Sequence, residues 1–322
     1  MMHRRFGLAA GLVVLVLVSS PRAQQPANIA DVEIEVLRVK GNVYMMVGRG
    51  GNTTVQVGPQ GVLVVDTMLE AAADKLVAAI EKLAPGNPIR YVLNTHAHGD
   101  HTGGNLKVSE AGAQLVAGNF AGQLGAAGAN SAFIVAHENV MRALSTQPGV
   151  PFGALPTDTF FKDQKDMYFN GEAIQLLHSP AAHTDGDVMV FFRSSDVIST
   201  GDLFVTTSYP RIDAQRGHVN GVIEALNRII DLAVSEQFSE GGTRIVPGHG
   251  RISDEMDVVE YRDMVTIVRD RVQHMIGKGM TLAQIKAARP TLDFDPRYGS
   301  DTGPWTTAMF IDAVYGGLNA KP

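Results

Sequence analysis

Residues 94–104 concentrate metal-binding side chains into a short stretch of the chain. The stretch reads NTHAHGDHTGG, and six consecutive positions within it hold three imidazoles and a carboxylate: His96, His98, Asp100 and His101. Neutral imidazole and carboxylate supply the nitrogen and oxygen donors that Zn²⁺ accepts. His96 and His98 share one face at the two-residue period of a strand, whereas the other two donors follow a bend. We therefore predict a metal site of one or more ions here; a solvated histidine-rich loop is the alternative.

Three segments later in the chain supply further donors of the same kinds. His183 precedes the strand-like run VMVFF, and Asp202 and His249 each follow a short apolar run. Every donor thus falls at a junction between a strand and a loop. Loops at strand ends are where a rigid scaffold holds functional groups. The repeated placement therefore predicts one shared site rather than scattered core histidines.

The elements that must position these donors follow from the apolar patterning and its turn residues. Strands are expected at residues 43–47, 53–57, 61–66, 89–93 and 244–246, with further short strands between 167 and 205. Helices are expected at residues 68–83, 133–142, 219–234 and 254–276. The Pro- and Gly-rich residues 145–156 are predicted to pass between two halves of the fold. His137, in the helix predicted over the site, is expected to pack structurally rather than to act in catalysis.

These motifs in this order resemble the metallo-β-lactamase superfamily, whose signature is His-x-His-x-Asp-His followed by a later His, a later Asp and a late Gly-His. The resemblance spans residues 36–276 and involves several separated segments, which makes chance agreement far less likely than for one short motif. It implies an α+β fold, a four-layer αββα sandwich with the metals at one edge between the two sheets. It also implies how the donors divide between two zinc ions: His96, His98 and His183 on the first, Asp100, His101 and His249 on the second, and Asp202 on both.

Departures from particular branches of the superfamily narrow the choice of metal. The chain has no cysteine, so it lacks the thiolate that one β-lactamase class places on the second zinc, and Asp202 stands in that position. The combination of His101 with Asp202 is more similar to glyoxalase II and the broader hydrolase branch. Diiron members carry an acid in place of the second His of the motif, so His98 favours two Zn²⁺ per chain. Nitrogen and oxygen donors also suit iron or manganese.

The ligand set predicts hydrolysis without a serine or cysteine nucleophile. Two divalent ions can lower the pKa of bound water toward ~7 and polarise a carbonyl, and we expect Asp100 to act as the catalytic residue that orients the water. Candidate substrate contacts lie in the segment after Asp202: Tyr209, Arg211 and His218. The hydroxyls of Thr95, Thr184 and Ser199 either fix the imidazoles or satisfy local backbone groups.

The composition of the first 23 residues predicts the cellular compartment of the protein. His3-Arg4-Arg5 precedes an uncharged apolar run over 6–18 and a small-residue segment ending at Ala23, which are the three parts of a secretory signal. The apolar run is shorter than the ~20 residues that span a bilayer, so a cleaved signal at 1–23 is favoured over an uncleaved anchor, although Pro21 is an imperfect residue near the cut. We expect export to a Gram-negative periplasm, with no stable membrane insertion after cleavage.

Composition limits the class of partner and the domain organisation. The net charge of −6 offers no basic surface for nucleic acid, so a small-molecule substrate is expected; the sequence leaves the oligomeric state open. An exported domain of this length buries enough apolar area to fold without disulfides. We expect one metallo-β-lactamase domain over 31–276 and a C-terminal extension over 277–322 that packs on it.

Together these features predict an exported dinuclear zinc hydrolase of a small-molecule amide or ester. A β-lactam is the leading named substrate because export suits an antibiotic, although residues 203–206 lack the basic side chain that would bind the drug carboxylate. A lactone, or a thioester as in glyoxalase II, is the alternative, and no helical glutathione-binding domain is evident. An iron-dependent redox enzyme and a non-catalytic metal-binding protein are rivals from other classes; the complete ligand set argues against the second.

Overall fold

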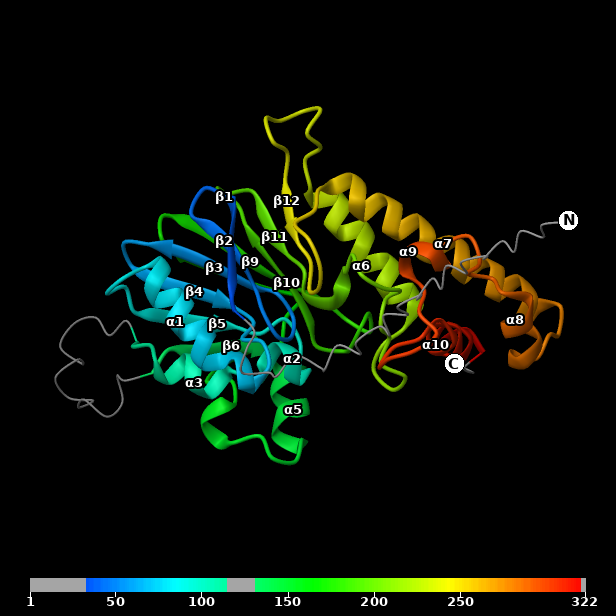
Figure 1. The fold of residues 1–322 in the computed structure, drawn as a ribbon, viewed down its shortest axis with the longest axis horizontal. Helices are drawn as coiled ribbons and strands as arrows, with labels where there is room; N and C mark the ends of the chain where they lie inside the picture. The colour runs from blue at the N-terminus through cyan, green and yellow to red at the C-terminus, as the bar shows by residue number, and fades with distance from the viewer. Residues whose placement is uncertain (1–32, 115–130, 320–322) are drawn as a thin grey trace, which may run out of the picture.

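The computed structural model describes residues 33–114 and 131–319, which form two β-sheets stacked face to face between two layers of helices (Figure 1). The signal predicted at 1–23 lies outside the described residues. Within the described part of the chain, no helix has the length and apolar character needed to cross a membrane.

The first sheet has seven strands that neighbour one another in chain order. They are β1 Glu35–Lys40, β2 Val43–Val47, β3 Thr53–Gly58, β4 Gly61–Val65, β5 Ile89–Leu93, β6 Phe133–His137 and β7 Asp158–Phe160. Strands β1 to β4 pair antiparallel, and β4 to β7 pair parallel. Because parallel strands end at the same edge of a sheet, the loops after β4, β5 and β6 open side by side.

The second sheet has five strands in the order β12-β11-β10-β9-β8. They are β8 Gln164–Phe169, β9 Glu172–Ser179, β10 Asp187–Phe192, β11 Val197–Ser199 and β12 Arg244–Val246. Strands β8 to β11 pair antiparallel, whereas β11 and β12 pair parallel. The carboxyl ends of β9, β11 and β12 therefore lie at one edge of this sheet.

Helices cover the outer face of each sheet (Figure 1). They are α1 Ala73–Leu83, α2 Gly99–Thr102, α3 Asn105–Glu110, α5 Glu138–Thr146, α6 Val219–Leu232, α7 Glu255–Gly277, α8 Leu282–Ala288, α9 Asp295–Tyr298 and α10 Thr307–Asn319, with 3-10 turns at Glu70–Ala72, Phe152–Ala154 and Gly201–Leu203. Helices α1 and α3 lie on the first sheet, and α6, α7 and α10 on the second. This arrangement confirms the predicted α+β fold with four αββα layers.

The layers follow from the alternation of side chains along each strand, which point to opposite faces of a sheet. In β4, Leu63 and Val65 pack between the two sheets, whereas Val62 and Val64 pack in the cluster that contains Leu76 of α1. Every residue of β4 is buried. A continuous apolar run is therefore required here, because both faces of the strand are covered.

The second sheet repeats this alternation against its own helices. Val188 and Val190 of β10 face the first sheet, whereas Met189 packs in the cluster of α6 and α7. Phe310 and Val314 of α10 belong to that same cluster. The C-terminal residues thus share the core of the second half.

Two expectations about the elements were wrong. Residues 133–142 form strand β6 followed by α5 rather than one helix, because a short apolar run cannot be told from a buried helix by its periodicity alone. Residues 145–156 do not pass between the two halves. They lead to β7 of the first sheet, and the chain crosses to the second sheet at residues 161–163; the three residues of β7 are too few to produce a pattern in the sequence.

Candidate metal centre

Strand β5 delivers the first group of donors to the edge of the first sheet. Asn94 N donates to Val135 O of β6 at 2.9 Å, so the chain keeps its strand direction up to the first histidine. The side-chain amides of Asn94 and Asn105 donate to each other at 3.0 and 2.9 Å, which ties this loop to α3. The chain then turns into α2, which carries Asp100 and His101. Buried hydrogen bonds therefore hold the motif, unlike a solvated loop.

The second sheet brings three donors to the same edge. His183 lies in the connection from β9 to β10, Asp202 follows β11, and His249 follows β12. These positions adjoin because β11 runs parallel to β12 and antiparallel to β10. Donors from four separate segments thus meet between the two sheets.

His96, His98 and His183 form the first group of potential ligands. Nε2 of His183 lies 2.9 Å from Nδ1 of His98, and the ring centres of His96 and His183 are 4.7 Å apart. Asp202 reaches this group, since its Oδ2 lies 3.7 Å from Nε2 of His183. Three imidazole nitrogens with a carboxylate beside them are a donor set that Zn²⁺ accepts.

Asp100, His101 and His249 form the second group. Nε2 of His249 lies 3.3 Å from Oδ2 of Asp100 and 3.4 Å from Nε2 of His101. Oδ1 of Asp202 lies 3.2 Å from Nε2 of His101 and 3.5 Å from Nε2 of His249. Asp202 therefore directs one oxygen toward each group, as a carboxylate shared by two cations requires.

Two buried polar atoms in this cluster make no hydrogen bond, Nε2 of His96 and Oδ1 of Asp202, although the second lies 3.2 Å from Nε2 of His101. Two of the rings have a partner on the outer nitrogen: Nδ1 of His183 lies 2.6 Å from the carbonyl oxygen of Arg211, and Nδ1 of His96 lies 3.0 Å from Oγ1 of Thr95. A partner on the outer nitrogen leaves the inner nitrogen for a cation. Because unpaired buried polar atoms are costly, the residues present fit the binding of divalent cations.

The protonation states of the cluster also suit metal binding. Burial lowers the pKa of His98 to about 4, with the charges of His183 and Arg211 adding to the effect. Burial raises the pKa of Asp202, but the charge of His101 outweighs it and holds that pKa well below its ordinary value. Burial also opposes a charge on His101, whose pKa nevertheless rises well above its ordinary value because of Asp202 and a second carboxylate. A cation that binds here displaces the His101 proton.

That second carboxylate is Asp66, which sequence reasoning placed only at the end of a strand. Its side chain is buried; Oδ1 accepts from Thr95 N at 2.8 Å, and Oδ2 accepts from Thr95 Oγ1 at 2.7 Å. Oδ2 also lies 2.8 Å from Nδ1 of His101. Asp66 therefore positions both His101 and the neighbour of His96. The signal that could have found it is a lone carboxylate ending the apolar run GVLVV.

Two glycines allow the loops of both sheets to close around the donors. A Cβ on Gly51 would strike the ring of His101, and a Cβ on Gly248 would strike Oδ1 of Asp202. Because any larger residue would displace a donor, both positions require glycine.

Of the three hydroxyls proposed to fix the imidazoles, Thr95 is the one that contacts a donor ring. Thr184 donates to Asp187, and the hydroxyl of Thr54 donates to that of Ser199. The latter two hydroxyls therefore satisfy their own surroundings, which was the alternative interpretation.

Arg211 is the predicted substrate contact that lies beside the centre. Its carbonyl group holds the ring of His183, and its charge lowers the pKa of His98. The side chain is exposed, and its guanidinium makes no hydrogen bond or ion pair with the residues that the structure describes. An unpaired cation at this position is available to an anionic group of a ligand.

The prediction of Tyr209 as a substrate contact was wrong. Its side chain is 1 % exposed and stacks on Phe310 of α10. Its hydroxyl donates to Thr291 O at 3.1 Å and lies 3.0 Å from Oδ1 of Asp295. The C-terminal helices cover this tyrosine, so it stabilises their packing and is closed to a ligand.

His218 lies at the start of α6, where its Nδ1 accepts from Asn220 N at 3.0 Å. A side chain that accepts from the second residue of the helix is an N-cap. The ring also lines a cleft beside α10, so it does not join the seven donors.

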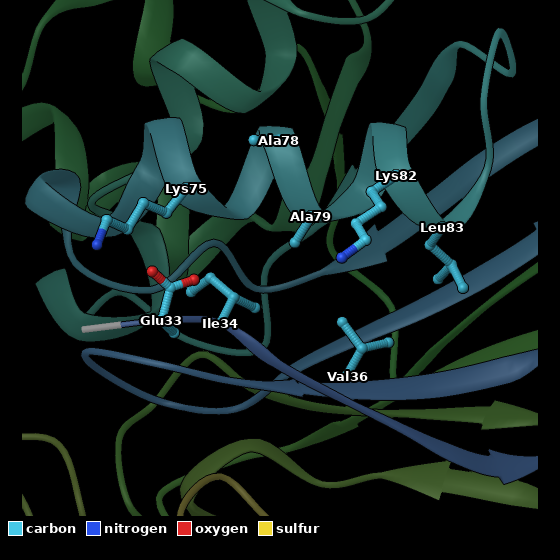
Figure 2. A pocket seen from close by; sticks show the side chains of 8 residues that line it. All are labelled: Glu33, Ile34, Val36, Lys75, Ala78, Ala79, Lys82 and Leu83. Atoms are coloured by element: carbon cyan, nitrogen blue, oxygen red, sulfur yellow. The ribbon is translucent and has the colours of Figure 1, made fainter. Parts of the chain in front are cut away.

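A polar cleft of about 740 Å³ opens beside His98, between α5 and residues 213–216. Its lining includes Asn139, Arg142 and Arg216. Another cleft, of about 630 Å³, lies between residues 33–36 and α1, where Figure 2 shows Ile34 facing the helix. Its lining contains none of the seven donors, whereas the cleft that includes His98 opens beside the centre.

Comparisons with known proteins agree with this geometry. The model of the Metallo-beta-lactamase superfamily matches residues 46–249. A hydroxyacylglutathione hydrolase from Methylococcus capsulatus is 24% identical over 228 residues, which cover 68% of this chain and 72% of that protein.

Solved structures share the fold at low sequence identity. The sec-alkylsulfatase Pisa1 from Pseudomonas sp. superposes with a TM-score of 0.64 at 15% identity, over 88% of this chain and 50% of the alkylsulfatase, so the chain spans half the length of that protein. A metallo-beta-lactamase from Pontibacter korlensis gives a TM-score of 0.55 at 15% identity, over 73% of this chain and 99% of its own. These likenesses concern the fold alone.

Proposed function

Because the chain belongs to the metallo-beta-lactamase superfamily, we propose that it is a dinuclear zinc hydrolase that cleaves an ester or thioester of a small molecule. The observation that carries the proposal is the convergence of seven donors around His96 Nε2, a buried atom that makes no hydrogen bond. A binding protein without activity has no need of a complete site that opens into a cleft.

The residues of the chain take distinct roles in this proposal. Divalent cations, when bound, supply a water of lowered pKa and a Lewis acid for the carbonyl. The side chain of Asp100 is 31% exposed, whereas that of Asp202 is 9% exposed, so Asp100 is the carboxylate that is more accessible to a water. Burial raises the pKa of Asp100, but its hydrogen bond to His249 and the charge of His101 outweigh this effect and lower the pKa to about 2. The ionised Asp100 therefore accepts a hydrogen bond from that water and orients it.

Arg211 completes the proposed site as the group that binds an anionic part of the substrate. It is exposed beside His98 and has no competing partner among the described residues. A guanidinium can bind a carboxylate through two hydrogen bonds. We do not assign such a role to Tyr209, which is buried, or to His218, which caps α6.

We favour an ester or thioester over a β-lactam as the substrate because of the proteins that the chain resembles. The relative matched along the sequence is a hydroxyacylglutathione hydrolase, which favours a thioester or ester, whereas the β-lactamases share the fold at 15 and 18% identity. We also propose that the protein is exported to the periplasm after cleavage of residues 1–23, on the composition of that segment.

Metal analysis combined with a substrate panel tests the proposal. The purified protein should contain two zinc ions per chain and hydrolyse a thioester or aryl ester, with activity lost to a chelator and restored by Zn²⁺. The panel includes nitrocefin and a lactone. His274→Ala is the matched control for ligand variants, because His274 is exposed on α7 outside the cluster. Two zinc ions without turnover of any compound would support binding alone, and iron in place of zinc would support redox chemistry.

A further inference from the structure

The segment 211–218 separates two clefts of opposite character. Asp213, Gln215 and Arg216 line the polar cleft that contains His98. Ile212 and other residues of the segment line a second cleft, against α10. Ala214 lines both clefts. The polar cleft at the metal centre and the cleft beside α10 therefore share one wall and meet at a single small side chain.

This wall is tied to the metal centre by backbone hydrogen bonds. Asp213 N donates to His183 O at 2.9 Å, and His218 N donates to Ala182 O at 3.0 Å. A Cβ on Gly217 would lie 2.5 Å from His183 O, so glycine is required for this close approach. The wall and the donor His183 thus form one unit, which fixes the distance from the centre to the second cleft.

The cleft beside α10 is apolar and open to solvent. It has a volume of about 420 Å³, and Met309 on its rim is 41% exposed. Trp305 and Gly316 form other parts of the lining. The acidic side chain in the lining, Asp312, is paired with Lys286 at 2.5 Å. The other polar groups of the lining are the ring of His218 and the indole N–H of Trp305, and the rest is mainly apolar, so such a surface can bind hydrocarbon.

We propose that the substrate of this enzyme is an amphiphile, with its polar, hydrolysable end in the cleft at His98 and an unbranched hydrocarbon chain that passes Ala214 into the cleft beside α10. The inference rests on the proposed hydrolase function for the position of the scissile bond. The shared wall is the reason to assign the apolar cleft to the substrate: Ala214 lines both clefts, so the two adjoin at this residue.

Fluorescence of Trp305 tests the apolar cleft independently of turnover, because Trp305 is the single tryptophan of the chain. The zinc-loaded protein is titrated with hexanoate, octanoate and decanoate, which carry the same carboxylate on chains of increasing length. We expect a saturable blue shift of the emission. Full burial of a CH₂ group tightens binding by about fourfold, so decanoate should bind at least tenfold more tightly than hexanoate.

Two variants alter the cleft at positions that tolerate the change. Met309→Glu places a charge on the rim and should weaken decanoate binding at least tenfold. Met256→Glu is the matched control, because Met256 is also an exposed methionine in the first turn of a helix, at 52%, and lies outside the cleft. Gly316→Leu fills the cleft, since a Cβ there meets no atom within 4 Å, and should remove the preference for decanoate over hexanoate.

The same chain lengths are then compared as substrates, in one ester series that varies the acyl group and one that varies the alcohol. We expect kcat/KM to rise with chain length in one series, and this rise to disappear in Gly316→Leu. Turnover without any dependence on chain length, together with an unchanged Trp305 emission, would overturn the inference and leave the hydrolase proposal intact. Chain-dependent binding at Trp305 without turnover of any ester would support the amphiphile site and reject the hydrolase proposal.

Discussion

Replacement of Asp66 by asparagine should remove the second metal ion while the protein stays folded. Asp66 has a backbone φ of +62°, a conformation in which Asn and Asp are enriched, and the two side chains have the same shape. The amide oxygen of the asparagine side chain can still accept from Thr95 N, as Oδ1 of Asp66 does at 2.8 Å. The change therefore acts at one atom, Oδ2, which becomes an NH₂ group.

That atom faces Nδ1 of His101 at 2.8 Å and Oγ1 of Thr95 at 2.7 Å. An amide NH₂ donates where the carboxylate accepted, so Nδ1 of His101 must become the acceptor and its proton must move to Nε2. Nε2 is the atom directed at Asp202 and His249, and a protonated nitrogen cannot bind a cation. Loss of such an outer partner costs about 10- to 100-fold in metal affinity, or roughly 1.4–2.7 kcal/mol.

Zinc affinity is measured by competition with a chromophoric chelator, and zinc content by mass spectrometry after desalting. We expect about one tightly held ion per chain in Asp66→Asn, against two in the unaltered protein. The free energy of unfolding of the metal-free protein should fall by about 1–3 kcal/mol, as for one mispaired buried group. As a control, Asp231→Asn removes the same charge from an exposed position on α6, and this variant should still bind both ions. Two ions bound by Asp66→Asn with unaltered affinities would refute this reasoning.

Four further changes have defined outcomes. His98→Ala should lower turnover by more than about 100-fold, since loss of a ligand exceeds the loss of an outer partner, with an unaltered circular dichroism spectrum. Metal-loaded Asp100→Ala should be inactive, and near-normal turnover would exclude its orienting role. Arg211→Gln should raise KM for an anionic substrate about tenfold without changing kcat, because a hydrogen bond to a charged group contributes about 1.5–3 kcal/mol; an unchanged KM would remove its assignment. Burial and the charge of His178 lower the pKa of His137 to about 4 from 6.5. Between these pH values the unfolded chain takes up a proton at His137 that the folded chain does not. The stability of the metal-free protein should therefore fall as the pH falls from about 6.5 to about 4. The urea midpoint of His137→Asn should fall less over this range, and an equal fall would contradict the assignment.

The resemblance to the metallo-β-lactamase superfamily implied the α+β sandwich, and the sequence collected the seven donors that the structure brings together. The motifs that carry the resemblance, and the strand and helix patterns that agree with it, are local signals. Strand and helix periods are properties of short windows, and the types and spacing of His and Asp residues carry the chemistry of a metal site without reference to the rest of the fold. The zinc identity, the role of Asp100 and export remain predictions, because no contact between described residues tests them.

Other features required the tertiary structure because they arise where distant segments meet. The sequence places Asp66 only at the end of a strand. The pairing of β4 with β5 brings its carboxylate against His101. The sequence predicted Tyr209 as a substrate contact, but in the structure its ring stacks on Phe310 of α10 and is covered by that helix. The shared wall at Ala214 exists because segment 211–218 lies against the α10 cleft on one side and the His98 cleft on the other. Burial and hydrogen bonding between segments depend on the folded path of the chain, and local side-chain patterns do not encode which distant surfaces will be in contact.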